Sequence, residues 1–328
     1  MKAIITGDIH LGIGKNDPIW LKQSIRLFSS IVDECHRRNI DWLFVLGDIF
    51  HDRKTIGVET LNTALEIANI LEDNNINCIF LVGNHDSFRK NNIDINSVKI
   101  FDKYSNITNI YKPTTMFGNI GFTSWSDDKP DMNVDYLFGH FEINDFLMSD
   151  YIVSQKAKLN INNFARYKKV YSGHYHIPSS KGNITYLGVP YPLDFRDSSL
   201  RGFYEFDDGE IEFIEFNDAI KFVKISTEEI PQKKKIFGNI VKLIFERDYG
   251  ITENDKKIDI IQNMGPLRFH TDYSNISKEI KIDQEEIENI ALKDNKQILL
   301  DFMDRSPVPS HLDRVKLDKI INMLIEEL

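Results

Sequence analysis

Five short apolar segments in the first part of the chain are each followed at once by polar side chains of the kind that bind metal ions. The segments that read as strands are Ala3–Thr6, Trp42–Leu46, Cys78–Val82, Tyr136–Phe138 and Val170–Tyr171. The polar residues behind them are Asp8, His10, Asp48, Asn84, His85, Asp86, His140, His174 and His176. A glycine precedes the first polar residue each time, and glycine lets the backbone turn sharply and lets a ligand come close. Five independent repeats of this arrangement, each at a strand end, are not expected by chance. The pattern therefore predicts one shared metal site.

The spacing of apolar residues predicts a layered α/β core. Two helical faces lie between the first three strands, formed by Leu21, Ile25, Phe28, Ile31 and Val32 and by Leu61, Leu65, Ala68 and Leu71. Strands that alternate with helices form parallel sheets, whose functional residues gather at the carboxyl ends of the strands. A more antiparallel half is expected from the later segments Asn119–Ser124, Thr185–Leu187, Gly202–Phe206 and Glu210–Glu215. We therefore expect two packed sheets flanked by helices.

A polar stretch at Ser226–Lys235 interrupts the apolar pattern and is typical of a domain boundary. Beyond it, a small α/β cap is predicted from a strand at Ile240–Phe245, a helix at Glu253–Asn263 and a strand at Leu267–Thr271. The tail is predicted to be helical over Gln284–Met303 and again from Ser310, after a break with two prolines. These patterns divide the chain into residues 1–225, 226–282 and 283–328.

Composition excludes some classes of protein and leaves others open. No apolar run approaches the roughly 20 residues that cross a bilayer, and the N-terminus enters a strand without a signal peptide. Cys35 and Cys78 lie in apolar segments and are expected to be reduced, which fits the cytoplasm, or the host cytoplasm if a phage encodes the chain. A net charge of -10 argues against simple coating of nucleic acid, but basic residues outnumber acidic ones between Lys221 and Lys281. A DNA-binding surface would therefore be local.

The types of ligand indicate which metals and which chemistry to expect. Oxygen and imidazole ligands without a thiolate favour Mn²⁺, Fe²⁺ or Zn²⁺ over Ca²⁺. Asp8 and His10, like His174 and His176, are alternate residues, and alternate residues of an extended chain point the same way. One carboxylate shared by two ions about 3.5–4 Å apart is the arrangement for in-line attack on phosphorus. The pattern therefore predicts two-metal hydrolysis of a phosphoester.

The ordered motifs Asp-x-His, Gly-Asp, Gly-Asn-His, Gly-His and Gly-His-x-His resemble the calcineurin-like metallophosphoesterase superfamily over residues 1 to 215. The resemblance implies a four-layer α/β/β/α sandwich. It implies that one metal is held by Asp8, His10, Asp48 and His176, and the other by Asp48, Asn84, His140 and His174. It also implies that His85 is not a ligand but faces the scissile phosphate, with Asp86 orienting its imidazole.

Longer motifs are similar to the nuclease subunit of SbcC–SbcD-type repair complexes and to its phage recombination-endonuclease relatives. These motifs are Gly-Asp-Ile-Phe-His-Asp-Arg-Lys (47–54), Gly-His-Phe-Glu-Ile-Asn (139–144) and Tyr-Lys-Lys-Val-Tyr-Ser-Gly-His-Tyr-His (167–176). The resemblance implies a nuclease with double-strand exonuclease and single-strand endonuclease activity that uses Mn²⁺, or Mg²⁺, in DNA recombination and repair. His51, which lies in the first of these motifs shortly after Asp48, would help to position the substrate, unless it is only a surface loop residue.

The same resemblance implies the partners. The cap would contact DNA, the C-terminal helices would dock on a coiled-coil ATPase of the SbcC type, and the catalytic domain would form a homodimer through its helices. An apolar stripe of helical spacing suits that docking and consists of Leu317, Ile320, Ile321, Leu324, Ile325 and Leu328. Packing on the helix's own domain is the commoner use of such a stripe, but a short helix after a break with two prolines, far from the core in sequence, favours docking on a partner.

Two other functions compete with the nuclease. A phosphodiesterase for cyclic nucleotides would use the same metals, but it needs neither a cap nor a partner-docking helix. A metal-free scaffold on the same fold is disfavoured, because every ligand position and His85 are present.

Overall fold

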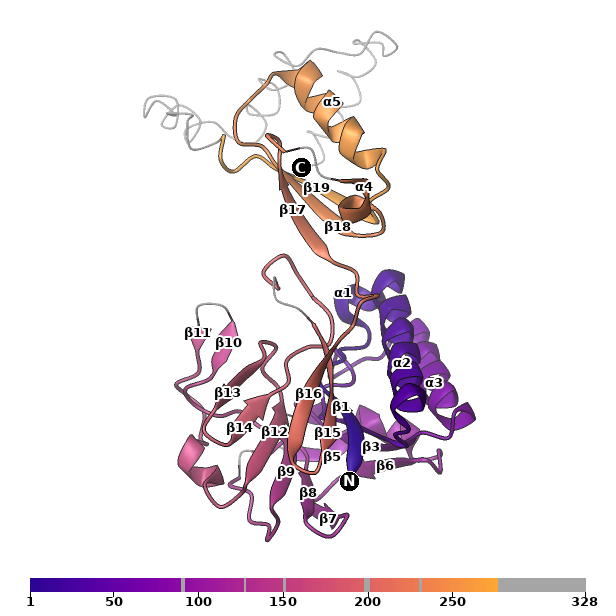
Figure 1. Ribbon diagram of the computed structural model, residues 1–328, viewed down its shortest axis with the longest axis vertical. Helices are drawn as coiled ribbons and strands as arrows, with labels where there is room; N and C mark the ends of the chain where they lie inside the picture. Colours follow the sequence, from indigo (N-terminus) through magenta and orange to yellow (C-terminus); the bar gives the residue numbers. More distant parts are fainter. Residues whose placement is uncertain (90–91, 127, 150–151, 198–200, 230–231, 277–328) are drawn as a thin grey trace, which may run out of the picture.

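The computed structural model describes residues 1–89, 92–126, 128–149, 152–197, 201–229 and 232–276. Two six-stranded sheets pack against each other, and a three-stranded sheet lies beyond them (Figure 1). The predicted Gln284–Met303 helix, the helix from Ser310 and the apolar stripe lie outside the described residues. No helix within the described ranges is long and apolar enough to cross a membrane.

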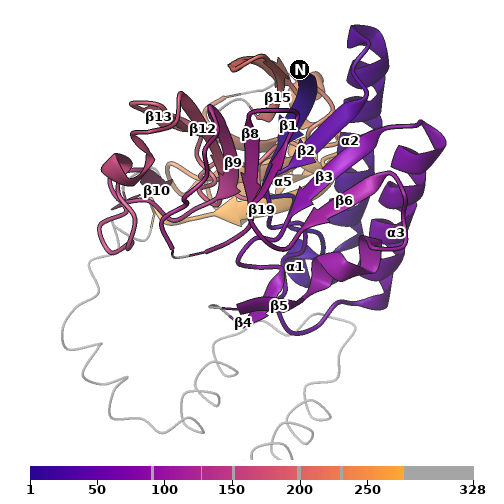
Figure 2. The ribbon, with the colours of Figure 1, turned by 90° about the horizontal axis from the view of Figure 1, so that it is seen from below.

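The first sheet has the strand order β16-β15-β1-β2-β3-β6. Its strands are β1 (Lys2–Thr6), β2 (Trp42–Val45), β3 (Asn77–Leu81), β6 (Ile107–Ile110), β15 (Gly202–Asp207) and β16 (Glu210–Glu215). β1, β2, β3 and β6 are parallel, and β15 and β16 form an antiparallel hairpin at the edge. Helices α2 (Pro18–Arg38) and α3 (Val58–Asp73) cover the outer face of this sheet (Figure 2).

The second sheet has the order β13-β14-β12-β9-β8-β7. Its strands are β7 (Thr114–Met116), β8 (Ile120–Thr123), β9 (Tyr136–His140), β12 (Lys169–Gly173), β13 (Ser179–Lys181) and β14 (Ile184–Tyr186). The expectation of an antiparallel half is wrong for its centre, where β14, β12, β9 and β8 are parallel. The reason is that long crossovers, rather than tight turns, join these strands, and crossovers bring successive strands back in the same direction.

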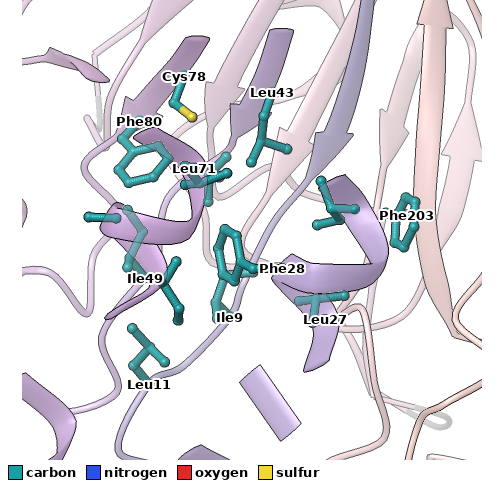
Figure 3. Packing of buried hydrophobic residues seen from close by; sticks show 14 of the residues in the cluster. Ile9, Leu11, Leu27, Phe28, Leu43, Ile49, Leu71, Cys78, Phe80 and Phe203 are labelled. Atoms are coloured by element: carbon teal, nitrogen blue, oxygen red, sulfur yellow. The ribbon is translucent and has the colours of Figure 1, made fainter. Parts of the chain in front are cut away.

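Alternation along the strands of the first sheet separates its two faces. Leu43 and Phe80 point toward α2 and α3, whereas Phe44 and Ile79 point toward the second sheet. The helix-side core also receives apolar residues from the loops that follow β1 and β2: Ile9, Leu11 and Ile49 (Figure 3). These apolar neighbours anchor the loops that carry the predicted metal ligands.

The outer face of the second sheet is covered by a thinner layer. The 3-10 helix η2 (Ile161–Phe164) and the strands β10 (Leu147–Ser149) and β11 (Ile152–Val153) lie on this side, and Phe164 packs with Phe141 in a separate core. The predicted layered α/β fold is confirmed. The remaining short elements are α1 (Ile13–Asn16), β4 (Ser87–Arg89), β5 (Asn92–Asn96), η1 (Ser97–Phe101) and α4 (Lys233–Ile236).

The third sheet consists of three parallel strands with one helix. These elements are β17 (Phe222–Ser226), β18 (Ile240–Ile244), α5 (Ile251–Gln262) and β19 (Arg268–Asp272). The predicted boundary between residues 225 and 226 falls inside β17, because Phe222–Ser226 pairs with β18. This third sheet contacts the two-sheet part of the molecule through the ion pair of Arg268 with Asp17 and the stacking of Phe222 on Trp20.

Candidate metal centre

The five predicted strand ends meet where the carboxyl edges of the two sheets adjoin. β1, β2 and β3 supply this edge from the first sheet, and β9 and β12 supply it from the second (Figure 2). Backbone hydrogen bonds join the loops after β1 and β2, since Asp8 N donates to Gly47 O at 3.1 Å and His10 N donates to Asp48 O at 2.9 Å. The nine polar residues singled out at the strand ends therefore gather at one place.

Several of the predicted ligands have a backbone conformation that is unusual for a residue with a side chain. The φ angle is +52° at Asp8, +53° at His10, +51° at Asp48 and +94° at His174. Left-handed φ values are uncommon outside glycine and concentrate at functional sites, where the surrounding structure holds the strain. Asp8 and His10 thus reach the same cluster through two left-handed residues, and not through the extended chain that the spacing suggested.

Two of the glycines are required by close packing around Asp48. Gly47 has a φ of +89°, and a Cβ there would lie 2.6 Å from Nδ1 of His140. A Cβ on Gly83 would lie 2.2 Å from both the backbone nitrogen and Oδ1 of Asp48. Any side chain at either position would displace a predicted ligand, which explains the Gly-Asp and Gly-Asn pattern.

The potential ligand atoms form overlapping groups, each with its members within 4.8 Å of one another. Asp8, His10 and His176 make one group, and Asp48, His140 and His174 make another. Nε2 of His10 and Nε2 of His176 are 3.0 Å apart. Asn84 belongs with the second group, since its Oδ1 lies 3.0 Å from Nε2 of His140 and 2.8 Å from Nδ1 of His174. The resemblance places Asp48 in both metal sites, whereas here Asp48 belongs to the second group alone; the other ligands are divided between the groups as the resemblance implies.

Asp48 lies between the two groups. Its Oδ2 is 3.9 Å from Nε2 of His10, and its Oδ1 is 3.4 Å from Nε2 of His140. Nδ1 of His140 donates a hydrogen bond to the carbonyl of Leu46 at 2.7 Å. Because a carbonyl oxygen can only accept, Nδ1 carries a proton, and the ring directs Nε2 toward Asp48. This arrangement suits a carboxylate that bridges two cations.

The electrostatics of the cluster are those of a cation site. Burial disfavours the imidazolium of His140, but the Asp48 carboxylate outweighs this effect and raises the pKa of His140 to about 9. Burial and the neighbouring His140 lower the pKa of His174 to about 3, and burial also lowers the pKa of His10 and His176. Most of the imidazoles are therefore neutral donors at neutral pH, as metal ligation requires. The donor set fits two divalent ions.

Asp86 does not orient His85, and that prediction is wrong. Its carboxylate accepts hydrogen bonds from the backbone nitrogens of Phe50 (2.8 Å), Gly83 (2.8 Å) and Ile49 (3.2 Å). Burial and the nearby Asp48 raise the pKa of Asp86 to about 6. The side chain thus joins the loop after β2 to the loop after β3 from inside the protein.

The backbone of His51 performs the orienting role expected of Asp86. Nδ1 of His85 donates to the carbonyl of His51 at 2.7 Å, which leaves Nε2 of His85 directed away from this contact. The imidazole of His51 is half-buried and stacks on His85 with ring centroids 5.6 Å apart. His10, His51 and His85 form a third group of close nitrogen atoms, so His51 lies at the site and not on a remote loop surface.

Two residues at the site were not predicted from the sequence. Trp125 follows β8, with its ring 5.2 Å from that of His174. Arg201 is buried; its Nη1 donates to the carbonyl of His176 at 2.6 Å and its Nη2 donates to Asp197 at 2.6 Å. The position of Trp125 at a strand end was a signal in the sequence. Arg201 contacts the backbone of a predicted ligand that is distant in sequence, so no local sequence pattern marks it.

Comparison with known proteins identifies the family. The model of the calcineurin-like phosphoesterase family matches residues 1–178, which cover all of the predicted ligands. The chain belongs to this family. The resemblance inferred from the motifs is confirmed, and the family together with the Asp and His clusters indicates a dinuclear metal site.

Two curated proteins and one solved structure are similar to this chain. The chain is 28% identical to exonuclease subunit 1 of Enterobacteria phage T4, over 100% of this chain and 99% of that protein. It is 25% identical to the DNA double-strand break repair protein Mre11 of Nanoarchaeum equitans (strain Kin4-M), over 67% of this chain and 70% of that one. A crystal structure of a dimetal phosphatase from Danio rerio aligns at a TM-score of 0.32 with 11% identity, covering 62% of this chain and 91% of that one.

The role of Asp86 can be tested by comparing the stability of two variants. We expect Asp86→Ala to lower the free energy of unfolding by about 3 kcal/mol or more, because three buried amides lose their acceptor. His85→Ala removes a half-buried side chain with one hydrogen bond and should cost about 1 kcal/mol. Urea denaturation in EDTA measures both without a contribution from metals. Equal losses in the two variants would mean that Asp86 acts mainly through His85.

Proposed function

We propose that this chain is a Mn²⁺-dependent DNA nuclease, with exonuclease activity on duplex ends and endonuclease activity on single strands. The observation that carries the proposal is the convergence of six oxygen and imidazole donors on the two sides of the buried Asp48, which is itself the seventh. In this proposal Asp8, His10, Asp48 and His176 hold one ion, and Asp48, Asn84, His140 and His174 hold the other. When bound, two such ions acidify a water and neutralise charge on the attacking and leaving oxygens.

The composition of the donor set favours Mn²⁺ over Mg²⁺. His10, His140, His174 and His176 supply imidazole nitrogens, and Mg²⁺ prefers oxygen ligands and retained waters. Mn²⁺ accepts oxygen ligands and tolerates imidazole. His10, His174 and His176 have a lowered pKa and are neutral at neutral pH, so their lone pairs are available to the ion.

His85 is assigned to contact the scissile phosphate. Its backbone nitrogen donates to Oδ1 of Asp48 at 2.8 Å, and its Nδ1 is fixed on the carbonyl of His51. Nε2 is thereby left for a ligand, on a side chain that is only half-buried. A positioned imidazole of this kind can donate a proton to a leaving oxygen. His51 stacks beside it and is assigned to position the same phosphate group.

DNA is proposed as the substrate because the relatives' names concern DNA ends. The phage relative is named an exonuclease subunit, and the archaeal relative is named for repair of DNA double-strand breaks. A hollow of 760 Å³ at the junction of the cap and the catalytic part adds physical support, since its lining includes Lys221, Lys224, Lys234 and Lys235. Lysines arranged in this way suit a phosphate backbone. We assign the cap to duplex binding.

A partner subunit is part of the same proposal. The full-length relative is named as a subunit, which implies that it works with another chain. We propose that residues 283–328 dock on the coiled coil of an SbcC-type ATPase through the apolar stripe that ends at Leu328. We also propose that the catalytic part forms a homodimer.

Substitution of His85 tests the nuclease proposal. We expect His85→Asn to bind Mn²⁺ with unchanged stoichiometry while cleavage of labelled duplex DNA falls about 10²–10⁴-fold. His36→Asn is the matched control, because His36 is exposed on α2. Isothermal titration with Mn²⁺ and a gel assay give the two readouts. Cleavage at the normal rate in His85→Asn would refute its assignment, and faster turnover of a cyclic nucleotide than of DNA by the unmodified chain would refute the substrate.

Removal of the tail tests the docking proposal. A chain that ends at Ser306 should cleave short single strands with Mn²⁺ at a rate close to that of the full chain, because every predicted ligand remains. It should no longer co-purify with a co-expressed ATPase of the SbcC type. Leu324→Asp in the full chain is the milder variant, since it places a charge in the apolar stripe. Continued association of both variants with the ATPase would contradict the docking.

A further inference from the structure

A second hollow of 460 Å³ lies beside the metal centre, between the ends of β6 and β8. The loop after β6 contributes Tyr111 and Lys112 to its lining, and the loop after β8 contributes Trp125 and Lys129. This volume falls in the range of roughly 300–1,000 Å³ that is typical of small-molecule sites. We call it the Trp125 pocket.

The Trp125 pocket shares a wall with the metal centre. The ring of Trp125 is 5.2 Å from that of His174 and 6.0 Å from that of His140. The backbone nitrogen of Trp125 donates to the carbonyl of Val82 at 2.8 Å, directly before Gly83 and Asn84. The loop after β8, which lines the pocket, is thus hydrogen-bonded to the loop after β3, which carries Asn84, so an occupant of the pocket would lie near the metal centre.

Hydrogen bonds of Ser124 hold this wall in place. Its Oγ accepts from the backbone nitrogen of Val82 at 2.8 Å and donates to the carbonyl of Ile110 at 2.5 Å. Ile110 is the last residue of β6, so one hydroxyl joins the ends of β3, β6 and β8. The pocket is therefore a built feature of the sheet edges.

The lining combines aromatic rings with positive charge. Lys112, Lys129 and Lys158 line the hollow, and among the described lining residues Asp128 and Asp131 are acidic. Asp131 is paired with Arg166, which offsets its charge. Tyr111 is half-buried and lines the hollow beside these charges, and Trp125 is buried, so only a small part of its ring reaches the hollow. Aromatic rings beside lysines are the combination that binds unpaired nucleotides, because every base can stack and every phosphate is an anion.

We propose that the Trp125 pocket binds the nucleotide next to the scissile phosphate of a single-stranded substrate. This inference rests on the proposed nuclease function and specifies how that site would bind single-stranded DNA. A base can enter a pocket of this size only when it is not paired and stacked in a duplex. The pocket would therefore favour single strands and leave the binding of intact duplex ends unchanged.

Binding measured without metal tests this proposal independently of catalysis. We expect Lys112→Ala/Lys129→Ala to weaken binding of a fluorescent short oligothymidylate about tenfold in EDTA, as the loss of two phosphate contacts implies. Both lysines are exposed, so the fold should not change. Lys22→Ala/Lys103→Ala is the matched control, with two exposed lysines outside the pocket. Fluorescence anisotropy with the same length of single strand and of duplex gives the comparison.

A spectroscopic readout locates the base. Oligothymidylate should quench part of the tryptophan fluorescence of the unmodified chain, and Trp125→Phe should lose that quenching while Trp20 and Trp42 remain. Unchanged single-strand affinity in the double lysine variant, equal weakening for the duplex, or quenching that persists in Trp125→Phe would each overturn the pocket assignment. Hydrolysis of bis(p-nitrophenyl) phosphate with Mn²⁺ is measured in parallel. Its absence from the unmodified chain would count against the nuclease proposal and would leave the binding result standing.

Discussion

Hydrogen bonds across the interface of the two sheets determine the geometry of the metal centre. Nδ1 of His140, at the end of β9, donates to the carbonyl of Leu46 behind β2 at 2.7 Å. The backbone nitrogen of His174, behind β12, donates to the Asp8 carboxylate at 2.9 and 3.1 Å. Each bond connects one sheet to the other at its carboxyl edge. A small shift between the sheets would therefore separate the two halves of the ligand set.

Several features of the metal centre destabilise the folded state. Asp8, Asp48 and Asp86 are all buried, and burial raises the pKa of Asp8, so the metal-free fold carries carboxyl groups that would ordinarily be solvated. Left-handed backbone at Asp8 and His174 adds strain. The large cores on either side of the first sheet offset these costs, because they anchor the ligand loops through residues such as Ile9 and Ile49. Function, rather than stability, explains why these side chains are at the strand ends.

Much of the fold and of the site could be predicted because the relevant signals are local in the sequence. Apolar runs mark the strands, and a glycine before an acid or histidine marks each strand end. Other features depend on pairing between distant segments. The parallel centre of the second sheet follows from its crossovers, and Asp86 binds backbone amides of Ile49 and Phe50 in a distant loop, although its neighbour in sequence is His85. Arg201 acts through contacts that no spacing reveals, and the sequence offered only a strand-end position as a signal for Trp125.

The most direct measurement of the central claim is electron paramagnetic resonance of the chain loaded with Mn²⁺, together with equilibrium dialysis. A carboxylate shared between two ions about 3.5–4 Å apart should give a spin-coupled spectrum at two ions per chain. Asp48→Asn should abolish the coupling. One bound ion per chain, or two ions with the spectrum of isolated Mn²⁺, would contradict a bridged pair at Asp48.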